Sequence, residues 1–598
     1  MKKIGLLLVG SIIMIATMCT QKTTSEEVQV FLDEYNQNYQ RLLVDYSEAE
    51  WELNTRIVEG DTLASSKAQE ANRKIAAFTG SKENIEKARH YLNDVENLSE
   101  LQVKQLNTIL YMAASNPEVA GEVVQKRIKA ETQQTEKLFG FDFMVDSQSI
   151  TTNEIDRLLI ESTDLEERLK VWEASKEVGK VLKEGLANLR DLRNQSVQAL
   201  EYDDYFSYQV SDYGMTTDEM LELNRKFISE IWPLYRELHT WARYELAKKY
   251  NQNVPDMLPA HWLPNRWGQE WTGIIQVEGI NLDEKLKEKS AEWIVKEGEK
   301  FYLSLGFPAL PATFYEKSSL YPLPEDAGYK KNNHASAWHM DNAQDVRSLM
   351  SVEPNTSWWE TTLHELGHVY YFMSYTNPDV PIILRGGANR AYHEAIGSLI
   401  GLASLQKPFL MQYGLVDEEA ETDKIQALLN EALNYIVFIP WSAGVMTEFE
   451  HELYAKDLSQ DQYNQKWWEL KSKYQGIVPP VERGVEYCDA ASKTHINDDA
   501  AQYYDYAISY VLLFQLHDYI ARNILQQDPY ATNYYGNKEV GDFLYKIMYP
   551  GASVDWREHL KETIGTEISA QPLVDYFNPL MDYLKEANTG REHTLPEL

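Results

Sequence analysis

The sequence predicts a large, mostly α-helical protein with one core and very little β-structure. Apolar residues recur at every third or fourth position over long stretches, which is the period of an amphipathic helix. Alternating runs typical of half-buried strands are scarce, and prolines cluster between the helical stretches, as in NQNVPDMLPAHWLP and GFPALPATF. A chain of 598 residues could hold about two to four domains. We find no internal repeat and no low-complexity linker, and therefore interpret the chain as one unit.

The predicted helices follow one another along the whole chain. The first is EVQVFLDEYNQNYQRLLVDYSEAEWELNT, and further stretches with the same period lie at 154–200, 217–250, 284–305 and 423–456. Pro440 interrupts the last of these stretches. Because proline cannot donate a backbone hydrogen bond, we expect it to bend or divide that helix.

The N-terminus resembles a bacterial export signal. Two lysines precede an apolar run at 4–16, which is too short for a stable membrane anchor. Cys19 closes the run like the lipidated cysteine of bacterial lipoproteins, although Met18 is larger than the small residue expected there. We predict a signal peptide at 1–18, lipidation of Cys19 and a polar tether at 19–27, with simple secretion as the alternative. The protein would then be exported to the periplasm or cell envelope.

Composition excludes some partners. Asp and Glu number 92 against 57 Lys and Arg, which gives a formal charge of −35 and disfavours binding to nucleic acid or an anionic membrane. We therefore expect membrane contact only through the N-terminal lipid. Cys488 is the other of the 2 cysteines, and we predict that it is a small buried residue in a protein without an internal disulfide.

The segment TTLHELGHVYYF places two histidines four positions apart. A helix can begin just before it, with Thr356 or Ser357 as the N-cap. On a helix, His364 and His368 lie about 40° apart around the axis and about 6 Å along it. Their rings can therefore address one point, as two zinc ligands must.

The residues around the histidines fit the same chemistry. Glu365 is turned about 100° from His364, so it can take a proton from an attacking water without binding the metal. Gly367 leaves room beside the ligands. The alternative is an amphipathic helix with solvated or core histidines, but H-E-x-x-H arises by chance in such a chain only about twice in a hundred.

A third ligand is needed, because a catalytic zinc takes three protein ligands and leaves one position open. Ser374 stands where an extended motif would carry a third histidine. Downstream, LRGGANRAYHEAIGSLIGLASL leads into a second predicted helix, where either Glu394 or His393 could complete the set. Neighbouring helical residues point about 100° apart, so both cannot easily bind one metal. The residues alone favour neither.

Further motifs accompany the histidine pair in a fixed order. HELGH is followed about 25 residues later by HEAIG, and the chain also carries WGQEW, HASAW, KYQGIVPPV, KTHI and YYDYAISYVLLFQLHD. Together they resemble the angiotensin-converting-enzyme family of zinc peptidyl-dipeptidases, over a match from about residue 30 to near 585. The resemblance implies a catalytic domain at 28–598, folded as an α-helical zincin ellipsoid with a deep central groove.

The resemblance also implies a metal set and a general base. Glu394 would join His364 and His368 in binding one Zn²⁺ per chain, which settles the choice between Glu394 and His393. Glu365 would be the general base.

Other residues are assigned by resemblance to the substrate. His495 and Tyr506 would stabilise the oxyanion, with His495 also a candidate proton donor. His334 and Ala335, in HASAW, would hold the substrate backbone.

A clamp for the C-terminal carboxylate follows from the same resemblance. Lys493, Gln269 and Tyr503 would form it and leave room for two residues beyond the cut. A carboxypeptidase relative has arginine in place of Gln269, so glutamine favours dipeptide release. One extra residue after His495 leaves Tyr504 as a rival of Tyr503.

Two positions depart from the family pattern. Asp505 stands immediately before Tyr506, where animal members have an arginine that binds chloride, so we expect no chloride activation. Ser398 follows HEAIG where an aspartate is common, which changes the support around the metal ligands.

The sequence thus predicts a zinc metallopeptidase that releases C-terminal dipeptides from oligopeptides with a free carboxylate. The alternatives are a carboxypeptidase or oligo-endopeptidase on the same scaffold, and a non-catalytic lipoprotein that binds peptide or zinc. Retention of Glu365, His495 and Tyr506 argues against mere binding, which needs no base. The oligomeric state is left open.

Overall fold

The computed structural model describes residues 24–58, 62–275, 282–420 and 423–597. The predicted signal peptide and Cys19 lie outside the described residues. Helix α1 (Thr24–Thr55) begins inside the segment expected to be a tether. Among the described residues, no helix combines the length and the apolar character needed to cross a membrane.

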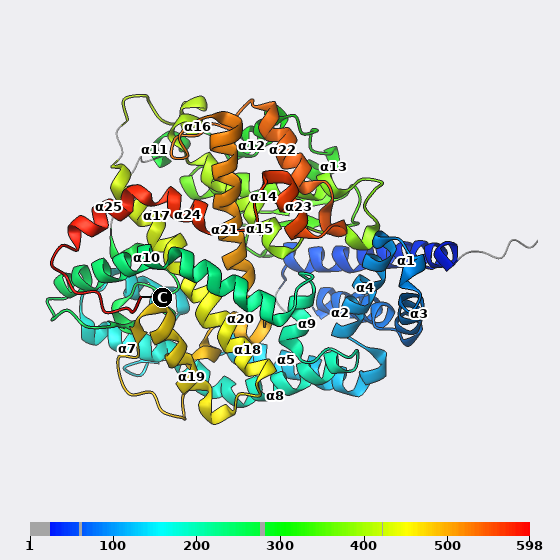
Figure 1. Ribbon diagram of the computed structural model, residues 1–598, viewed down its shortest axis with the longest axis horizontal. Helices are drawn as coiled ribbons and strands as arrows, with labels where there is room; N and C mark the ends of the chain where they lie inside the picture. Colours follow the sequence, from blue (N-terminus) through cyan, green and yellow to red (C-terminus); the bar gives the residue numbers. More distant parts are fainter. Residues whose placement is uncertain (1–23, 59–61, 276–281, 421–422, 598) are drawn as a thin grey trace, which may run out of the picture.

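Helices form nearly all of the regular structure, which confirms the predicted fold class (Figure 1). The stretches with helical period correspond to α1, α6 (Thr152–Glu161), α7 (Leu165–Lys176), α8 (Val178–Gln198), α10 (Thr217–Lys249), α11 (Asp283–Leu286), α12 (Ala291–Leu305), α17 (Lys424–Ile439) and α18 (Thr447–Ala455).

Pro440 divides the α17–α18 stretch as predicted. Helix α17 ends at Ile439, and a π-helical turn at Pro440–Met446 connects it to α18. Because proline offers no N–H to the preceding turn, the hydrogen-bond ladder changes its spacing at this point.

Strands in the described residues form three short pairs, so the prediction of very little β-structure is also confirmed. The pairs are β1 (Phe143–Val145) with β2 (Gln148–Ile150), antiparallel; β3 (Leu258–Pro259) with β6 (Ile477–Val478), parallel; and β4 (Ser336–His339) with β5 (Val346–Leu349), antiparallel. The β4–β5 pair contacts helix α14, which carries the histidine motif.

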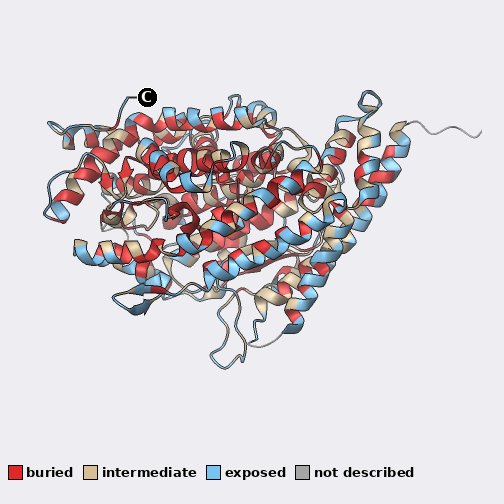
Figure 2. Cartoon of the chain, turned by 90° about the horizontal axis from the view of Figure 1, so that it is seen from below, coloured by how far each residue is buried: buried red, intermediate tan, exposed pale blue. Residues whose placement is uncertain are grey.

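One large hydrophobic cluster forms the core and extends from Leu138 to Leu595. Helices α1, α2 (Thr62–Thr79), α3 (Lys82–Leu92) and α4 (Glu100–Ser115) lie together at one end of the molecule in Figure 1. They contribute a smaller cluster that includes Val28, Leu32 and Leu106. In Figure 2 the outer helices are exposed on one face and buried on the other, which is the arrangement expected of amphipathic helices.

Three helices carry the candidate metal ligands and Tyr506: α14 (Thr356–Tyr375), α15 (Arg390–Ser404) and α21 (Tyr504–Tyr519). The N-cap of α14 is Asn355, whose side chain accepts a hydrogen bond from the Trp358 N–H at 2.9 Å. The expected N-cap at Thr356 or Ser357 is therefore wrong by one or two positions. Thr356 already belongs to the helix, because the Asn355 oxygen satisfies the free N–H of Trp358 in the first turn.

Candidate metal centre and active site

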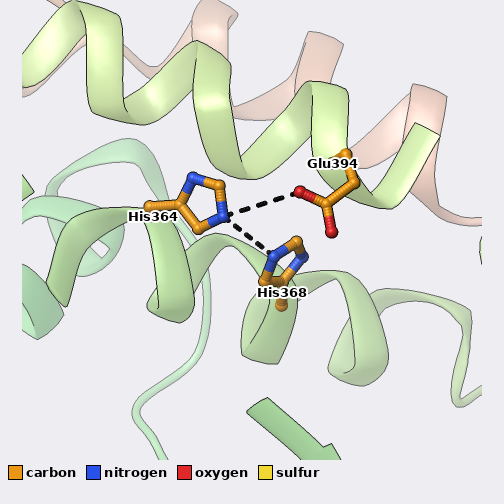
Figure 3. Close-up of side chains that lie close together, drawn as sticks. All are labelled: His364, His368 and Glu394. Carbon is orange, nitrogen blue, oxygen red and sulfur yellow. Dashed lines mark hydrogen bonds and ion pairs between the residues drawn. The ribbon is translucent and has the colours of Figure 1, made fainter. Parts of the chain in front are cut away.

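His364 and His368 on α14 and Glu394 on α15 converge on one point (Figure 3). The Nε2 atoms of the two histidines are 3.1 Å apart, and Oε2 of Glu394 is 4.0 Å from Nε2 of His364. One ligand atom from each of the three residues lies within 4.8 Å of the other two. The four-residue spacing on α14 accounts for the two histidines, while Glu394 is added by the packing of α15 against α14.

The spacing of these atoms fits a zinc ion. Tetrahedral bonds of about 2.0–2.1 Å separate neighbouring ligand atoms by about 3.3 Å, between the two distances observed here. Burial lowers the pKa of both His364 and His368 to about 4, so their rings are neutral at pH 7 and offer lone pairs. Two imidazoles and one carboxylate are the ligand set of a catalytic zinc with an open position.

Two glycines allow α14 and α15 to approach closely enough for this geometry. A Cβ atom added to Gly367 would lie 3.1 Å from the Cα of Gly397. A Cβ atom on Gly397 would lie 2.9 Å from both Cε1 and Nε2 of His364. The helix crossing and the ring of His364 therefore occupy the space that any larger residue would need.

Replacing Gly397 with alanine should therefore displace His364. We expect weaker zinc binding and a loss of about 1–3 kcal/mol in the free energy of unfolding, as is typical of overpacking. Zinc competition titration and urea unfolding measure the two effects. Gly401→Ala is the matched control one turn later, since its Cβ would meet only the Glu360 side chain at 3.5 Å. Normal zinc binding by the Gly397→Ala protein would contradict the explanation.

His393 lies behind His368. Its Nδ1 is 3.4 Å from Nδ1 of His368, on the side of that ring opposite Nε2. The rings of His393 and Tyr371 are 4.3 Å apart, and burial lowers the pKa of His393 well below its usual value. The structure thus brings Glu394 into the ligand cluster and leaves His393 in contact with the outer nitrogen of a ligand, where it can fix the orientation of that ring.

Glu365 lies beside the ligand cluster with its carboxylate buried. Only 6% of the residue is exposed, and its Oε2 has no hydrogen-bond partner among the described residues. Burial and the nearby Glu394 carboxylate raise the pKa of Glu365 to about 8. The raised pKa means that this carboxyl group holds a proton more tightly than a solvated one, and a catalytic acid or base works best with a pKa close to the working pH.

His495 and Tyr506 form a second pair of polar groups. His495 lies on α20 (Thr494–Asp498) and Tyr506 on the first turn of α21. The distance between Nε2 of His495 and the Tyr506 hydroxyl is 3.3 Å. Burial and the adjacent Lys493 lower the pKa of His495 to about 4, so the imidazole is neutral at pH 7 and has one N–H to donate.

Lys493 and Gln269 are far apart in the sequence, but their side chains are in contact. The Lys493 ammonium donates to Oε1 of Gln269 at 2.8 Å and lies 4.4 Å from the ring centre of Trp267 and 5.4 Å from that of Tyr503. Tyr504 instead packs edge-on against Tyr213 in the core. The structure therefore places Tyr503, and not Tyr504, beside Lys493.

His334 and Ala335 immediately precede strand β4. His334 is exposed; its N–H donates to Asn332 at 3.0 Å, and its ring Nδ1 is 2.8 Å from the carbonyl oxygen of Ala335. These are local contacts. The role of His334 and Ala335 in holding the substrate backbone stays a prediction.

Sequence reasoning missed one polar group of this region. Arg390 lies one turn before Glu394 and binds two aspartates, Asp499 and Asp505. Arg390 lies four positions before Glu394, on the same face of the helix, and this spacing could have marked it as a residue of the site. Its two partners lie more than a hundred residues away, and no local pattern indicates them.

Two helices bring two histidines and a glutamate together inside an α-helical body, and this arrangement fits a metal centre of the H-E-x-x-H class. Comparison with known proteins specifies the family. A family model described as angiotensin-converting enzyme matches residues 22–595. The chain therefore belongs to the angiotensin-converting-enzyme family of peptidases, and the resemblance seen in the motifs is confirmed.

Individual relatives agree with this assignment. Angiotensin-converting enzyme from Mesocricetus auratus is 30% identical over 596 residues, covering 96% of this chain and 44% of that protein. The enzyme from Oryctolagus cuniculus is 30% identical over 585 residues, covering 95% and 43%. The enzyme from Theromyzon tessulatum is 26% identical over 621 residues, covering 99% and 97%. The chain thus spans less than half the length of the first two relatives and nearly all of the third.

Proposed function

We propose that the protein is a zinc peptidyl-dipeptidase that removes dipeptides from oligopeptides with a free C-terminal carboxylate. The observation that carries this proposal is the convergence of His364, His368 and Glu394 with the unpaired carboxylate oxygen of Glu365 beside them. A metal-binding protein needs only the three ligands. The buried, unpaired base is useful only if a water must be deprotonated.

The residues divide the reaction between them. His364, His368 and Glu394 would hold zinc, which supplies Lewis acidity to the peptide carbonyl and to water. Glu365 accepts the proton of the attacking water and then delivers it to the leaving nitrogen. Tyr506 and His495, 3.3 Å apart, donate hydrogen bonds to the oxygen that becomes negative. Donors of this kind are typically worth about 3–4 kcal/mol of transition-state stabilisation each.

The clamp gives the proposal its dipeptide specificity. Lys493 supplies a cation, Gln269 an amide and Tyr503 an aromatic wall, and the Lys493–Gln269 contact is already formed at 2.8 Å. A carboxylate can replace the Gln269 oxygen as the partner of the ammonium group. By resemblance, a carboxypeptidase relative has arginine in place of Gln269, and the glutamine of this chain is expected to leave space for two residues beyond the cut.

The function is tested by the products formed from an N-terminally blocked pentapeptide. Mass spectrometry should detect a dipeptide and a blocked tripeptide, and amidation of the C-terminus should sharply weaken cleavage. Release of a single residue would support the carboxypeptidase alternative, and internal fragments from both peptides the oligo-endopeptidase alternative. Zinc content, measured on the same sample by plasma mass spectrometry, should be close to one ion per chain.

Substrate binding should weaken as the pH rises above 7. Burial and the nearby Arg266 guanidinium lower the pKa of Lys493 to about 7, so the free protein carries a charged Lys493 below that pH and a neutral one above it. KM for a peptide with a free carboxylate should therefore rise by up to about tenfold per pH unit above pH 7.

The control for this pH effect is Lys493→Arg, because a guanidinium stays charged throughout the range. Its KM should show a flatter profile, and an amidated peptide should show none of the carboxylate-dependent slope. An unchanged KM slope in the Lys493→Arg protein would exclude Lys493 as the titrating group.

Chloride should leave the activity unchanged. By resemblance, Asp505 stands where animal relatives have an arginine that binds chloride, and a buried acidic side chain in that place should repel an anion. Rates measured with chloride replaced by acetate at fixed ionic strength should agree within about twofold. A large increase that is specific to chloride would overturn this expectation.

A further inference from the structure

Arg390 joins the helix that carries Glu394 to the helix that carries Tyr506. It is the first residue of α15, one helical turn before Glu394. Its Nη1 and Nη2 donate to the two carboxylate oxygens of Asp499, at 2.9 and 2.6 Å. Its Nε lies 3.2 Å from Oδ2 of Asp505, in the first turn of α21. One guanidinium thus binds carboxylates from two segments, and its Cζ is 5.9 Å from the ring centre of Tyr506.

Tyr213 provides a second connection between the first turns of α15 and α21, and we call this pair of connections the junction. Asp505 is only 1% exposed, and its Oδ1 accepts a hydrogen bond from the Tyr213 hydroxyl at 2.6 Å. The backbone N–H of Ala391, next to Arg390, donates to the same hydroxyl at 3.3 Å. The first turns of α15 and α21 are therefore linked through the guanidinium and also through Tyr213. Burial raises the pKa of Asp505 to about 7, and the Arg390 guanidinium beside it favours the charged form.

This junction lies next to Tyr506, both in the chain and in space. Tyr506 follows Asp505 directly in the chain, and its hydroxyl is 3.3 Å from His495. Glu394 is held on the other helix of the junction. A shift of α21 against α15 would move the hydroxyl relative to the ligand cluster, and a misplacement of about 1 Å can cost about a hundredfold in rate.

We propose that Arg390 is a positioning residue for the reaction, which fixes the Tyr506 hydroxyl relative to Glu394 by binding Asp499 and Asp505. The Asp505 carboxylate is the built-in anion of this arrangement: the protein itself supplies the negative group that the guanidinium binds. The inference rests on the role given to Tyr506 in the proposed function. Arginine is required, because its planar fork binds Asp499 with two parallel hydrogen bonds while a third nitrogen faces Asp505; lysine has a single point of charge.

The first test is a double-mutant cycle between Arg390→Lys and Tyr506→Phe. Arg390→Lys should lower kcat by about 10–100-fold, with KM and zinc content within twofold of wild type. In the Tyr506→Phe background the same substitution should change kcat by less than threefold, because the hydroxyl to be positioned is gone. An equal loss of kcat in both backgrounds, or a loss confined to KM or zinc content, would overturn the proposal.

Arg557→Lys is the matched control for this cycle. Arg557 also binds two carboxylates, Asp555 at 3.0 Å and Glu219 at 3.9 Å, and its side chain is 36% exposed against 37% for Arg390. It lies outside the candidate site, so Arg557→Lys should leave kcat unchanged.

The second test asks whether an external anion can replace Asp505. Asp505→Ala leaves a buried space between the Arg390 guanidinium and the Tyr213 hydroxyl, which formate can fill. Formate at millimolar concentration should raise kcat of this variant at least fivefold and raise its Tm by several degrees. Wild type and the double variant Arg390→Gln/Asp505→Ala should not respond. A folded Asp505→Ala protein with wild-type kcat, or with low kcat and no response to formate, would refute the built-in anion.

Asp505→Asn keeps the experiment decisive if the alanine variant does not fold. The amide oxygen can still accept from Tyr213, but the negative charge is lost, so kcat should fall while KM stays within twofold. An unchanged kcat would overturn the proposal. Failure of the proposed function can be told apart from failure of this inference. If the proposed function is wrong, wild type releases no dipeptide. The Tm response to formate would still decide whether the Arg390–Asp505 arrangement is an anion site.

Discussion

Replacing Glu365 with glutamine should lower kcat by about 10³–10⁴-fold while zinc and peptide binding stay close to wild type. The substitution keeps the shape of the side chain but removes the proton acceptor, and a general base typically contributes about 10²–10⁴ in rate. We assign the role of general base to Glu365 alone, because it is the buried carboxylate with an unpaired oxygen beside the ligand cluster. Single-turnover hydrolysis, peptide calorimetry and zinc analysis of one preparation measure the three quantities.

The control is Glu360→Gln, which removes a half-buried carboxylate one turn before His364 on the same helix. It should keep at least a third of the wild-type rate. Equal turnover by wild type and Glu365→Gln would refute Glu365 as the base. A wild-type protein that binds peptide and zinc without any hydrolysis would support the non-catalytic lipoprotein instead.

Replacing Glu394 with alanine should remove zinc and, with it, essentially all hydrolysis. Glu394 supplies the only carboxylate of the ligand cluster found among the described residues, and two imidazoles alone hold zinc weakly. We expect the zinc affinity to fall by more than the 10–100-fold that is typical for the loss of an outer partner of a ligand. Competition with a chromogenic chelator measures the affinity, and the activity should return only at high added zinc.

His393→Ala provides the comparison for Glu394→Ala, since His393 contacts the outer nitrogen of His368 at 3.4 Å. Its zinc affinity should fall by no more than about 10–100-fold. If the His393 variant loses zinc more severely than the Glu394 variant, the ligand assignment is wrong. Undiminished activity of wild type after thorough chelation would contradict the metal mechanism altogether.

Features that depend on neighbours within a few residues could be predicted from the sequence. The helical period located α10 and α17, and Pro440 marked the point where the second of these ends. The spacing of His364 and His368 predicted that their rings meet, because positions four apart share one face of a helix. An N-cap depends on a single residue, and there the expected position was wrong by one or two residues.

Relations between distant segments could not be derived from local patterns. By the residues alone, Glu394 and His393 were equal candidates; the crossing of α14 and α15 at Gly367 and Gly397 turns Glu394 toward the histidines. Likewise, Tyr503 and Tyr504 are adjacent in sequence, but the packing of α21 places the first beside Lys493 and the second in the core.

The sequence by itself therefore determined the helical class, the family and the residues capable of the chemistry, because these follow from short-range spacing and from ordered motifs. Only the tertiary structure decided which of those residues meet and revealed that Arg390 ties Asp499 and Asp505 to the turn before Glu394. The physical reason is that a contact between helices is fixed by the shape of both packed faces, and that shape is specified by residues far apart in the chain.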